Sequence, residues 1–186
     1  MRTARKSFIL TAILAPALVC ALAQTASIDP ALLAKANAGD SAAQVQVGES
    51  YAAGKGVAQD YKQAAEWYRK AAEHGDAAAQ VQLAALYRDG KGVARDMAQA
   101  AEWYRKAAEQ GDVTAQGTLG LLYSLGQGVR HDDVEAYYWL DLAAAVKGPK
   151  QETYAANRQL IGTRITADEL DQVKERVAKW LAAHPR

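Results

Sequence analysis

The residues of this chain that could take part in chemistry, judged by their types and spacing, lie in short glycine-lysine stretches and in acidic pairs. The tripeptide Gly-Lys-Gly occurs at residues 54–56 and 90–92, and phosphate-binding loops also combine glycine with lysine. Neither stretch has the Gly-Lys-Ser or Gly-Lys-Thr ending of such a loop, and both recur as turns between predicted helices. The acidic pairs at 132–133 and 168–169 could act as the two carboxylates of a hydrolase. Each pair begins a predicted helix, where carboxylates interact favourably with the free backbone N–H groups, so helix capping explains them better.

The histidines and serines give no stronger candidate for a metal site or a nucleophile. His74, His131 and His184 are far apart in the sequence, and none has another ligand at a metal-binding spacing. The serines after residue 23 are at positions 27, 41, 50 and 124, and none lies in a nucleophile motif. We therefore predict no catalytic residue, no metal site and no cofactor.

The elements that carry these residues recur with a fixed step of 36 residues. The step relates Gly39, Gly75 and Gly111; Gln44, Gln80 and Gln116; Tyr51, Tyr87 and Tyr123; Gly56, Gly92 and Gly128; and Trp67, Trp103 and Trp139. A strict period of this length is typical of a stacked repeat array. It predicts an all-α protein that offers a surface to a partner in place of a catalytic pocket.

Each unit is predicted to be a pair of antiparallel helices. In the first unit, Gly39 would end a preceding helix, and Asp40 would cap the next one, which would stop at the turn 54–56. Asp60 would begin the second helix. Neither helix can bury its apolar stripe without neighbours, so the units must stack.

Two further positions carry expectations about packing. Gly48 has no side chain and would let a neighbouring helix approach closely. Arg69 and Lys70 lie opposite the apolar stripe of the second helix and would face water.

These residues resemble the Sel1-like repeat, a variant of the tetratricopeptide repeat. The first unit matches the family pattern at Gly39-Asp40, Ala43-Gln44, Val47-Gly48, Tyr51, Gly54-x-Gly56-Val57, Asp60, Ala64, Trp67-Tyr68 and Ala71-Ala72. The match recurs in the next two units, so that three repeats span residues 39–146. The resemblance implies a right-handed α-solenoid with no activity of its own, acting as an adaptor, often in a bacterial envelope.

The ends of the repeat region depart from the pattern. The second helix of the third unit is more apolar, with Tyr137, Tyr138 and Leu140 in place of Ala65, Glu66 and Tyr68. We expect residues 147–186 to cover it as a helical cap, with helices at about 149–160 and 166–182. Residues 24–38 form the predicted N-terminal cap, with a helix opening at Asp29-Pro30.

The first 23 residues have the order of a secretory signal peptide. Arg2, Arg5 and Lys6 precede an uncharged apolar run that ends in Ala-Leu-Ala at residues 21–23. The predicted cut follows Ala23. An uncleaved anchor and a lipid attached to Cys20 are alternatives, although the run is short for a membrane span and the residues before Cys20 fit a lipoprotein signal poorly.

Removal of this segment has consequences for charge and for cysteine chemistry. The formal net charge would change from +1 to −2, and the mature chain would contain no cysteine. A nearly neutral chain has no basic field for nucleic acid or for an anionic membrane surface. We therefore expect a periplasmic or secreted monomer whose partner is a protein.

A stripe on the first helices is the predicted partner-binding site. In tetratricopeptide-like stacks these helices line the concave face, and the positions opposite the core vary between units. The predicted stripe comprises Val45, Glu49, Ala52, Val81, Ala85, Arg88, Gly117, Leu121 and Ser124. It becomes more apolar in the third unit, where Leu122 and Leu125 would add to it unless they pack under the cap. We expect it to bind an extended segment or a helix with roughly micromolar affinity.

Two other functions are compatible with the sequence. The protein could inhibit or regulate a periplasmic cell-wall enzyme, as some similar proteins do. It could also be a weak hydrolase such as a β-lactamase, an activity claimed for related cysteine-rich repeats. The absence of cysteine after residue 23 makes the hydrolase the weaker alternative.

Overall fold

The computed structural model describes residues 27–185, and the regular secondary structure of these residues is entirely helical. The predicted signal peptide at 1–23 lies outside the described residues. The helices are α1 Pro30–Asn37, α2 Ser41–Ala53, α3 Tyr61–Glu73, α4 Ala77–Asp89, α5 Met97–Glu109, α6 Val113–Leu125, α7 Asp133–Ala144, α8 Gln151–Gly162 and α9 Ala167–Ala183. The predicted all-α class is confirmed.

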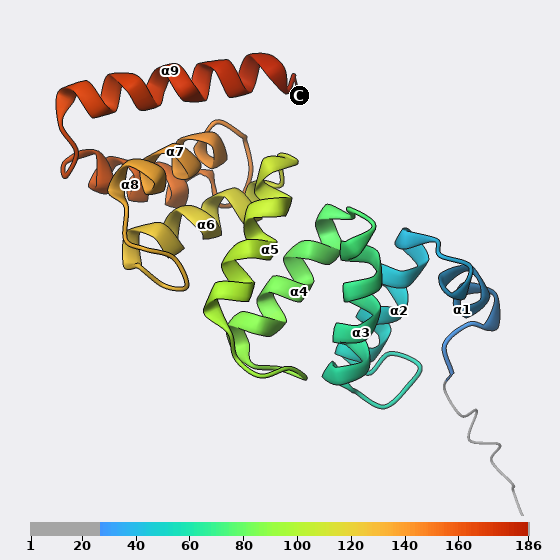
Figure 1. Ribbon diagram of the computed structural model, residues 1–186. Coiled ribbons are helices and arrows are strands. Elements are labelled where there is room, and N and C mark those ends of the chain that lie inside the picture. Colours follow the sequence, from blue (N-terminus) through green and yellow to red (C-terminus); the bar gives the residue numbers. More distant parts are fainter. Residues whose placement is uncertain (1–26, 186) are drawn as a thin grey trace, which may run out of the picture.

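The helices stack in pairs along the molecule. Within each unit α2 packs on α3, α4 on α5, and α6 on α7, while α3 also packs on α4 and α5 on α6. Figure 1 shows the pairs following one another from the N-terminal to the C-terminal end, which is the arrangement of an α-solenoid. The core is therefore three apolar clusters that follow one another along the stack, and the one in the C-terminal half is the largest.

Aspartate begins both helices of every unit. Asp40, Asp76 and Asp112 each accept a hydrogen bond from the backbone N–H three residues later, at 2.8, 2.8 and 2.7 Å. Asp60, Asp96 and Asp132 each accept two such bonds at the start of the second helix. These carboxylates satisfy N–H groups that have no partner within the helix. The repeated aspartates thus have a structural role.

The turn that ends each first helix rests on the preceding unit. Gly92 has φ +70°, and a Cβ there would overlap the backbone of Tyr61, the first residue of α3. Gly128 has φ +72° and lies in the same way on Met97, the first residue of α5. Only glycine combines this conformation with such a close approach.

A second close approach joins the two helices of a unit, as the sequence predicted for Gly48. A Cβ on Gly48 would lie 2.6 Å from Cε1 of Tyr68, so the tyrosine ring of α3 packs directly against the backbone of α2. In the third unit, a Cβ on Gly120 would lie 2.7 Å from Cγ of Leu140, so this helix pair is equally close.

Neighbouring units are also joined by hydrogen bonds between arginine and tyrosine. Arg69 on α3 donates to the hydroxyl of Tyr87 on α4 at 3.0 Å, and Arg105 on α5 donates to Tyr123 on α6 at 2.6 Å. The prediction that Arg69 simply faces water was therefore wrong, because its side chain is partly buried between two units. Lys70 is exposed, with Nζ 3.8 Å from the centroid of the Trp67 ring.

The C-terminal segment covers the apolar second helix of the third unit. Both α8 and α9 pack on α7, whose Leu140 and Leu142 are fully buried. Asp141 occupies the position of Arg69 and Arg105, and it pairs with Arg158 on α8 at 2.6 Å. The helix α8 begins two residues later than predicted, because residues 148–151 form a turn closed by a bond from the Gln151 N–H to the Gly148 carbonyl.

Candidate protein-binding face

The predicted stripe lies on α2, α4 and α6, and its residues differ in how far they are exposed to solvent. Glu49 is exposed and Gly117 is buried, whereas the other seven are partly buried: Val45, Ala52, Val81, Ala85, Arg88, Leu121 and Ser124. Val45 and Val81 pack against the apolar clusters between neighbouring units. These two valines therefore contribute to the scaffold as well as to the surface.

Gly117 is the member of the stripe that differs most from the expected open position. A Cβ on Gly117 would overlap the ring of Tyr154, which lies on α8. Tyr154 itself is 5% exposed. The cap helix α8 therefore covers the middle of α6, and it extends the predicted stripe beyond the third unit.

A hollow of about 170 Å³ lies between the C-terminal halves of α6 and α8. It is lined by Leu121, Ser124, Leu125, Asn157, Leu160, Ile161 and Arg164. Leu125 is 64% exposed and Leu160 is 55% exposed, and among the described residues they are the large apolar side chains that stand open to solvent. These two leucines leave apolar surface open beside the same hollow, which makes it a candidate contact site for another protein.

Leu122 and Leu125 have different environments, although the sequence allowed both to be open. Leu122 is 4% exposed and belongs to the core, as Leu86 does one unit earlier. Leu125 is the last residue of α6, where the helix ends at Gly126, and its side chain stays exposed. The sequence alone could not indicate Leu160, because the repeat pattern stops before α8 begins.

A second hollow, of about 250 Å³, lies where α6 and α8 begin. Its walls are Val113 and Thr114 on α6, the segment 146–151 and Tyr154. Gly117 on α6 contacts Tyr154 on α8, and this contact separates the second hollow from the first along the two helices. We call the residues that line the two hollows, together with Gly117, the α6–α8 face.

Charged side chains border the first hollow. Arg164 lies 3.6 Å from the carboxylate of Asp133, and Nε2 of His131 lies 3.3 Å from the same oxygen. Asp133 is the more buried partner, while the side chains of Arg164 and His131 are about half exposed, at 46% and 54%. Arg164 therefore borders the hollow with a half-exposed guanidinium whose charge is partly offset by Asp133.

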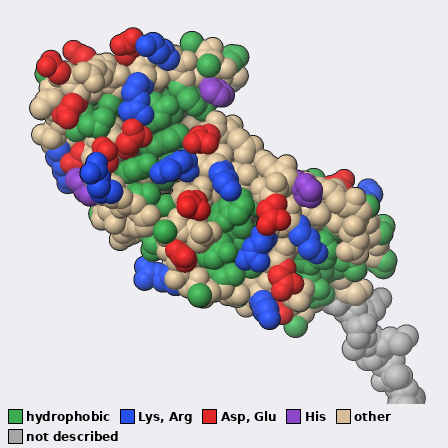
Figure 2. Space-filling model, in the orientation of Figure 1, with side chains coloured by type: hydrophobic (Ala, Val, Ile, Leu, Met, Phe, Trp, Pro, Cys, Tyr) green, Lys and Arg blue, Asp and Glu red, His purple; other side chains and the backbone are tan. Residues whose placement is uncertain are grey.

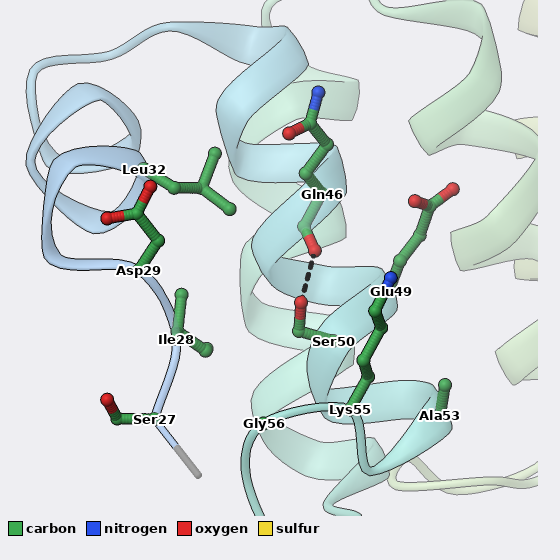
Figure 3. Close-up of a pocket in the computed structure, with 10 residues that line it drawn as sticks. All are labelled: Ser27, Ile28, Asp29, Leu32, Gln46, Glu49, Ser50, Ala53, Lys55 and Gly56. Atoms are coloured by element: carbon green, nitrogen blue, oxygen red, sulfur yellow. Dashed lines mark hydrogen bonds between the residues drawn. The ribbon is translucent and has the colours of Figure 1, made fainter.

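Another hollow lies at the opposite end of the molecule, between α1 and α2, and has a volume of about 750 Å³. Figure 3 shows Leu32 pointing from α1 toward α2, and Ser50 donating a hydrogen bond to the Gln46 carbonyl, at 2.9 Å. The helix α1 has only 8 residues, whereas α3 and α5 have 13. Ser50 occupies the repeat position at which the next two units have the buried Leu86 and Leu122. The N-terminal end of the stack thus has a polar residue, suited to contact with water, where the other units have a core leucine.

The side chains over the visible surface do not form a patch of a single charge. Figure 2 shows Lys and Arg mixed with Asp and Glu across the face in view. Within residues 27–185, no group of three His, Cys, Asp or Glu side chains is placed to hold a metal ion. Among the same residues, no helix is both long and apolar enough to cross a membrane.

The family of the chain follows from its repeats. The Sel1 repeat family model matches residues 41–76, 77–112 and 114–145. These matches cover more than half of the chain, and the chain belongs to the Sel1 repeat family. Sel1 repeat proteins are generally scaffolds for protein–protein interaction, and their fold is typically non-catalytic.

Solved structures of similar proteins have the same architecture. The Sel1 repeat protein from Oxalobacter formigenes is 36% identical with a TM-score of 0.65, over 70% of this chain and 52% of that one. A protective antigen of uropathogenic Escherichia coli with the same repeat fold is 31% identical with a TM-score of 0.61, over 81% of this chain and 40% of that one. The chain thus spans about half the length of the first protein and two-fifths of the second.

The cysteine-rich protein B of Helicobacter pylori shares the fold alone. It is 20% identical with a TM-score of 0.52, over 66% of this chain and 93% of that one. No curated protein sequence matches the chain.

Proposed function

We propose that this protein is an exported, non-catalytic adaptor of the bacterial envelope that binds a segment of another protein. The binding surface is the open part of the predicted stripe together with the α6–α8 face. The observation that carries this proposal is the pair of exposed leucines, Leu125 and Leu160, which line one hollow beside Leu121. Burying two leucine side chains and the walls of the hollow would contribute several kcal/mol to binding, roughly 1.5–3 kcal/mol for each side chain.

The C-terminal half of the stripe is favoured over the N-terminal hollow. The N-terminal hollow is larger, but Gln46, Glu49, Ser50 and Lys55 give its walls a polar character. The hollow at Leu125 combines apolar walls with the single cation of Arg164. A mixed surface of this kind suits an amphipathic segment with apolar anchors and an acidic residue.

Export is the second part of the proposal, and it rests on the sequence of residues 1–23. The basic start, the apolar run and the Ala-Leu-Ala ending suit a cleaved signal peptide. The Escherichia coli relative is described as a protective antigen, which is in keeping with export. Mass spectrometry of the protein from its native host should find Gln24 at the N-terminus, and a chain that begins at Met1 in the cytoplasm would contradict export.

Capture of the partner from envelope extract tests the binding surface. The wild-type protein and the double variant Leu121→Arg/Arg88→Glu are immobilised at equal amounts, and the captured proteins are compared by quantitative mass spectrometry. The proposal predicts a protein that the wild type retains and the double variant loses. A matched control, Gln172→Arg/Lys62→Glu, places the same new charges at exposed positions on α9 and α3 and should retain the partner. Equal capture by both double variants would reject the surface.

A further inference from the structure

We propose that the N-terminal hollow, between α1 and α2, binds the first turn of a helix from another protein, and that this turn begins with an aromatic residue. The hollow has a volume of about 750 Å³. One turn of an α-helix, with a diameter of about 10–12 Å and a pitch of about 5.4 Å, fills about 400–600 Å³. The hollow therefore has room for one turn. The inference concerns a second surface and does not depend on the α6–α8 face.

The end of α1 lies where the second helix of a preceding unit would end. Nε2 of Gln44 on α2 donates to the carbonyl of Ala36 on α1 at 3.1 Å. One step of 36 residues later, Nε2 of Gln80 on α4 donates to the carbonyl of Ala72 on α3 at 3.2 Å. The helix α1 therefore packs on α2 at its C-terminal end as α3 packs on α4.

The start of α1 differs from the start of α3. The helix α1 begins at Pro30, which corresponds to Glu66 in the middle of α3. Residues 27–29 are not helical and line the hollow, whereas their counterparts 63–65 lie within α3. The hollow therefore lies where the first half of a repeat helix would pack on α2.

The glycine of the following turn shows how a helix fills this place in the other units. A Cβ on Gly92 would overlap the backbone of Tyr61, the first residue of α3, and the corresponding glycine of the third unit makes the same contact with the start of α5. A Cβ on Gly56 would instead stay 3.1 Å from the nearest atom beyond its chain neighbours, the carbonyl oxygen of Ser27. The interface between units thus continues to the N-terminal end, where no described residue takes the place of the first helical turn.

The lysine of the same turn indicates the first residue of the incoming helix. Nζ of Lys91 lies 5.6 Å from the centroid of the Tyr61 ring, and in the third unit Gln127 and Met97 replace both members of this pair. Lys55 has the same repeat position in the first unit and lines the hollow, but it makes no ion pair or ring contact with another described residue. An aromatic ring at the start of the incoming turn would give Lys55 the contact that Lys91 has.

The walls of the hollow suit an amphipathic helix. Ile28 and Leu32 supply an apolar wall, and Figure 3 shows Leu32 pointing from α1 toward α2. Ser50 lines the opposite wall at the repeat position of Leu86, which is buried in one cluster with Ala65 of α3. Because serine is smaller and polar, the incoming turn can place a small or polar side chain against it. The apolar wall and the vacant ring position together favour a helix over a simple ion.

A peptide taken from the chain itself provides the probe. It has the sequence of residues 60–73, because this segment fills the equivalent place in the next unit. A lactam between Lys62 and Glu66, both exposed on α3, keeps the free peptide helical. The comparison peptide is identical except for serine in place of Tyr61.

Titration of the ¹⁵N-labelled protein that begins at Gln24 measures binding, through the NMR shifts of the backbone amides of residues 31–33 and 46–56. We expect saturable shifts with the tyrosine peptide at an affinity of roughly 100 µM. Binding of the serine peptide should be weaker by at least about fivefold, because it lacks the ring.

Variants of the turn and of α2 give the second part of the test. Lys55→Gln should weaken binding of the tyrosine peptide by about two- to fivefold and leave the serine peptide unaffected. The matched control Lys91→Gln, whose ring partner belongs to its own chain, should change neither. Ser50→Leu restores the leucine of the later units and should strengthen binding of the tyrosine peptide by about tenfold.

Several results would overturn the inference. Equal binding of the two peptides, or equal effects of Lys55→Gln and Lys91→Gln, would reject the aromatic first residue. Binding by a chain that begins at Ser27 but not by one that begins at Gln24 would make residues 24–26 the occupant. A wild-type dimer that dissociates when the peptide is added would make a second copy of the chain the occupant. The proposed function fails separately, through unchanged partner capture by Leu121→Arg/Arg88→Glu.

Discussion

Single glycine residues hold the units of this protein together at the turns. The repeated Gly-x-Gly turn reads as an ordinary loop in the sequence, but its second glycine lies on the backbone of the preceding unit, at Gly92 against Tyr61 and at Gly128 against Met97. The glycines that follow the second helices are different, because Gly75 has φ +91° but no neighbouring atom within 4 Å of the place that a Cβ would occupy. The sequence predicts a turn at both kinds of glycine, and only the structure shows that Gly92 contacts a neighbouring helix whereas Gly75 does not.

Gly92→Ala and Gly75→Ala form a matched pair that tests this distinction. Both substitutions place alanine at a positive φ, which costs about 1–2 kcal/mol. Gly92→Ala also forces the turn away from α3, so we expect its total loss of unfolding free energy to reach about 3 kcal/mol or more. Urea denaturation measures both, and equal losses in the two variants would contradict a packing role for Gly92.

Tyr68 gives a prediction about alkaline pH. Burial, and to a smaller extent the charge of Glu49, raise the pKa of Tyr68 from 10.0 to about 12. Because the folded pKa is raised, the contribution of Tyr68 to stability is fully present below pH 10 and is lost as pH rises toward 12. Tyr68→Phe should remove this part of the loss, measured as the change in unfolding free energy between pH 9 and 11.5. An unchanged pH dependence in Tyr68→Phe would contradict the assignment.

At the scale of the helix, the junction between α7 and α8 uses a contact that the regular units lack. Arg69 and Arg105 donate to tyrosines of the next unit, whereas Asp141, at the same position in the third unit, pairs with Arg158 at 2.6 Å. The sequence showed that position 141 breaks the pattern, but it could not show the partner, because α8 has no counterpart among the repeats. Aspartate in place of arginine at this position of the third unit therefore allows an ion pair that joins the cap to the repeat array.

A charge exchange tests this junction. Asp141→Arg alone places two cations side by side and should lower the unfolding free energy by about 1–2 kcal/mol, since the pair is only partly exposed. The double variant Asp141→Arg/Arg158→Asp restores opposite charges and should regain at least about 0.5 kcal/mol of that loss. Denaturant titration of the single and double variants measures the coupling. If the losses of Asp141→Arg and Arg158→Asp simply add in the double variant, the ion pair does not join the cap to α7.

The fold of the helices was predictable to a large extent because their start and stop signals are local. Aspartate caps, positive-φ glycines and the apolar stripe lie within a few residues of the boundaries that they set. The position of α8 over Gly117 was not predictable, because a contact between helices that do not share the repeat pattern depends on the whole cap. For this reason the sequence indicated the stripe on α6 but not its continuation on α8 through Tyr154 and Leu160.

At the scale of the whole molecule, the two ends of the stack differ. The C-terminal end has a complete helix, α9, packed over α7, whereas the N-terminal end has the eight-residue α1 beside an open polar hollow. In a repeat array each unit is stabilised mainly by its neighbours, so a poorly covered end unfolds first. We expect the backbone amides of α1 and α2 to exchange with deuterium at least about tenfold faster than those of α6 and α7. Equal protection at both ends would contradict this account.

The central claim is that a partner segment lies along the α6–α8 face, and site-specific photo-crosslinking tests it most directly. A photoreactive benzoylphenylalanine is placed at Leu125 or Leu160 on this face, or at Ala178, which is exposed on α9. After irradiation of intact cells, the account predicts that Leu125 and Leu160 give crosslinks to the same protein and that Ala178 does not. Crosslinks of equal yield from all three positions, or a partner crosslinked through Ala178 alone, would contradict it.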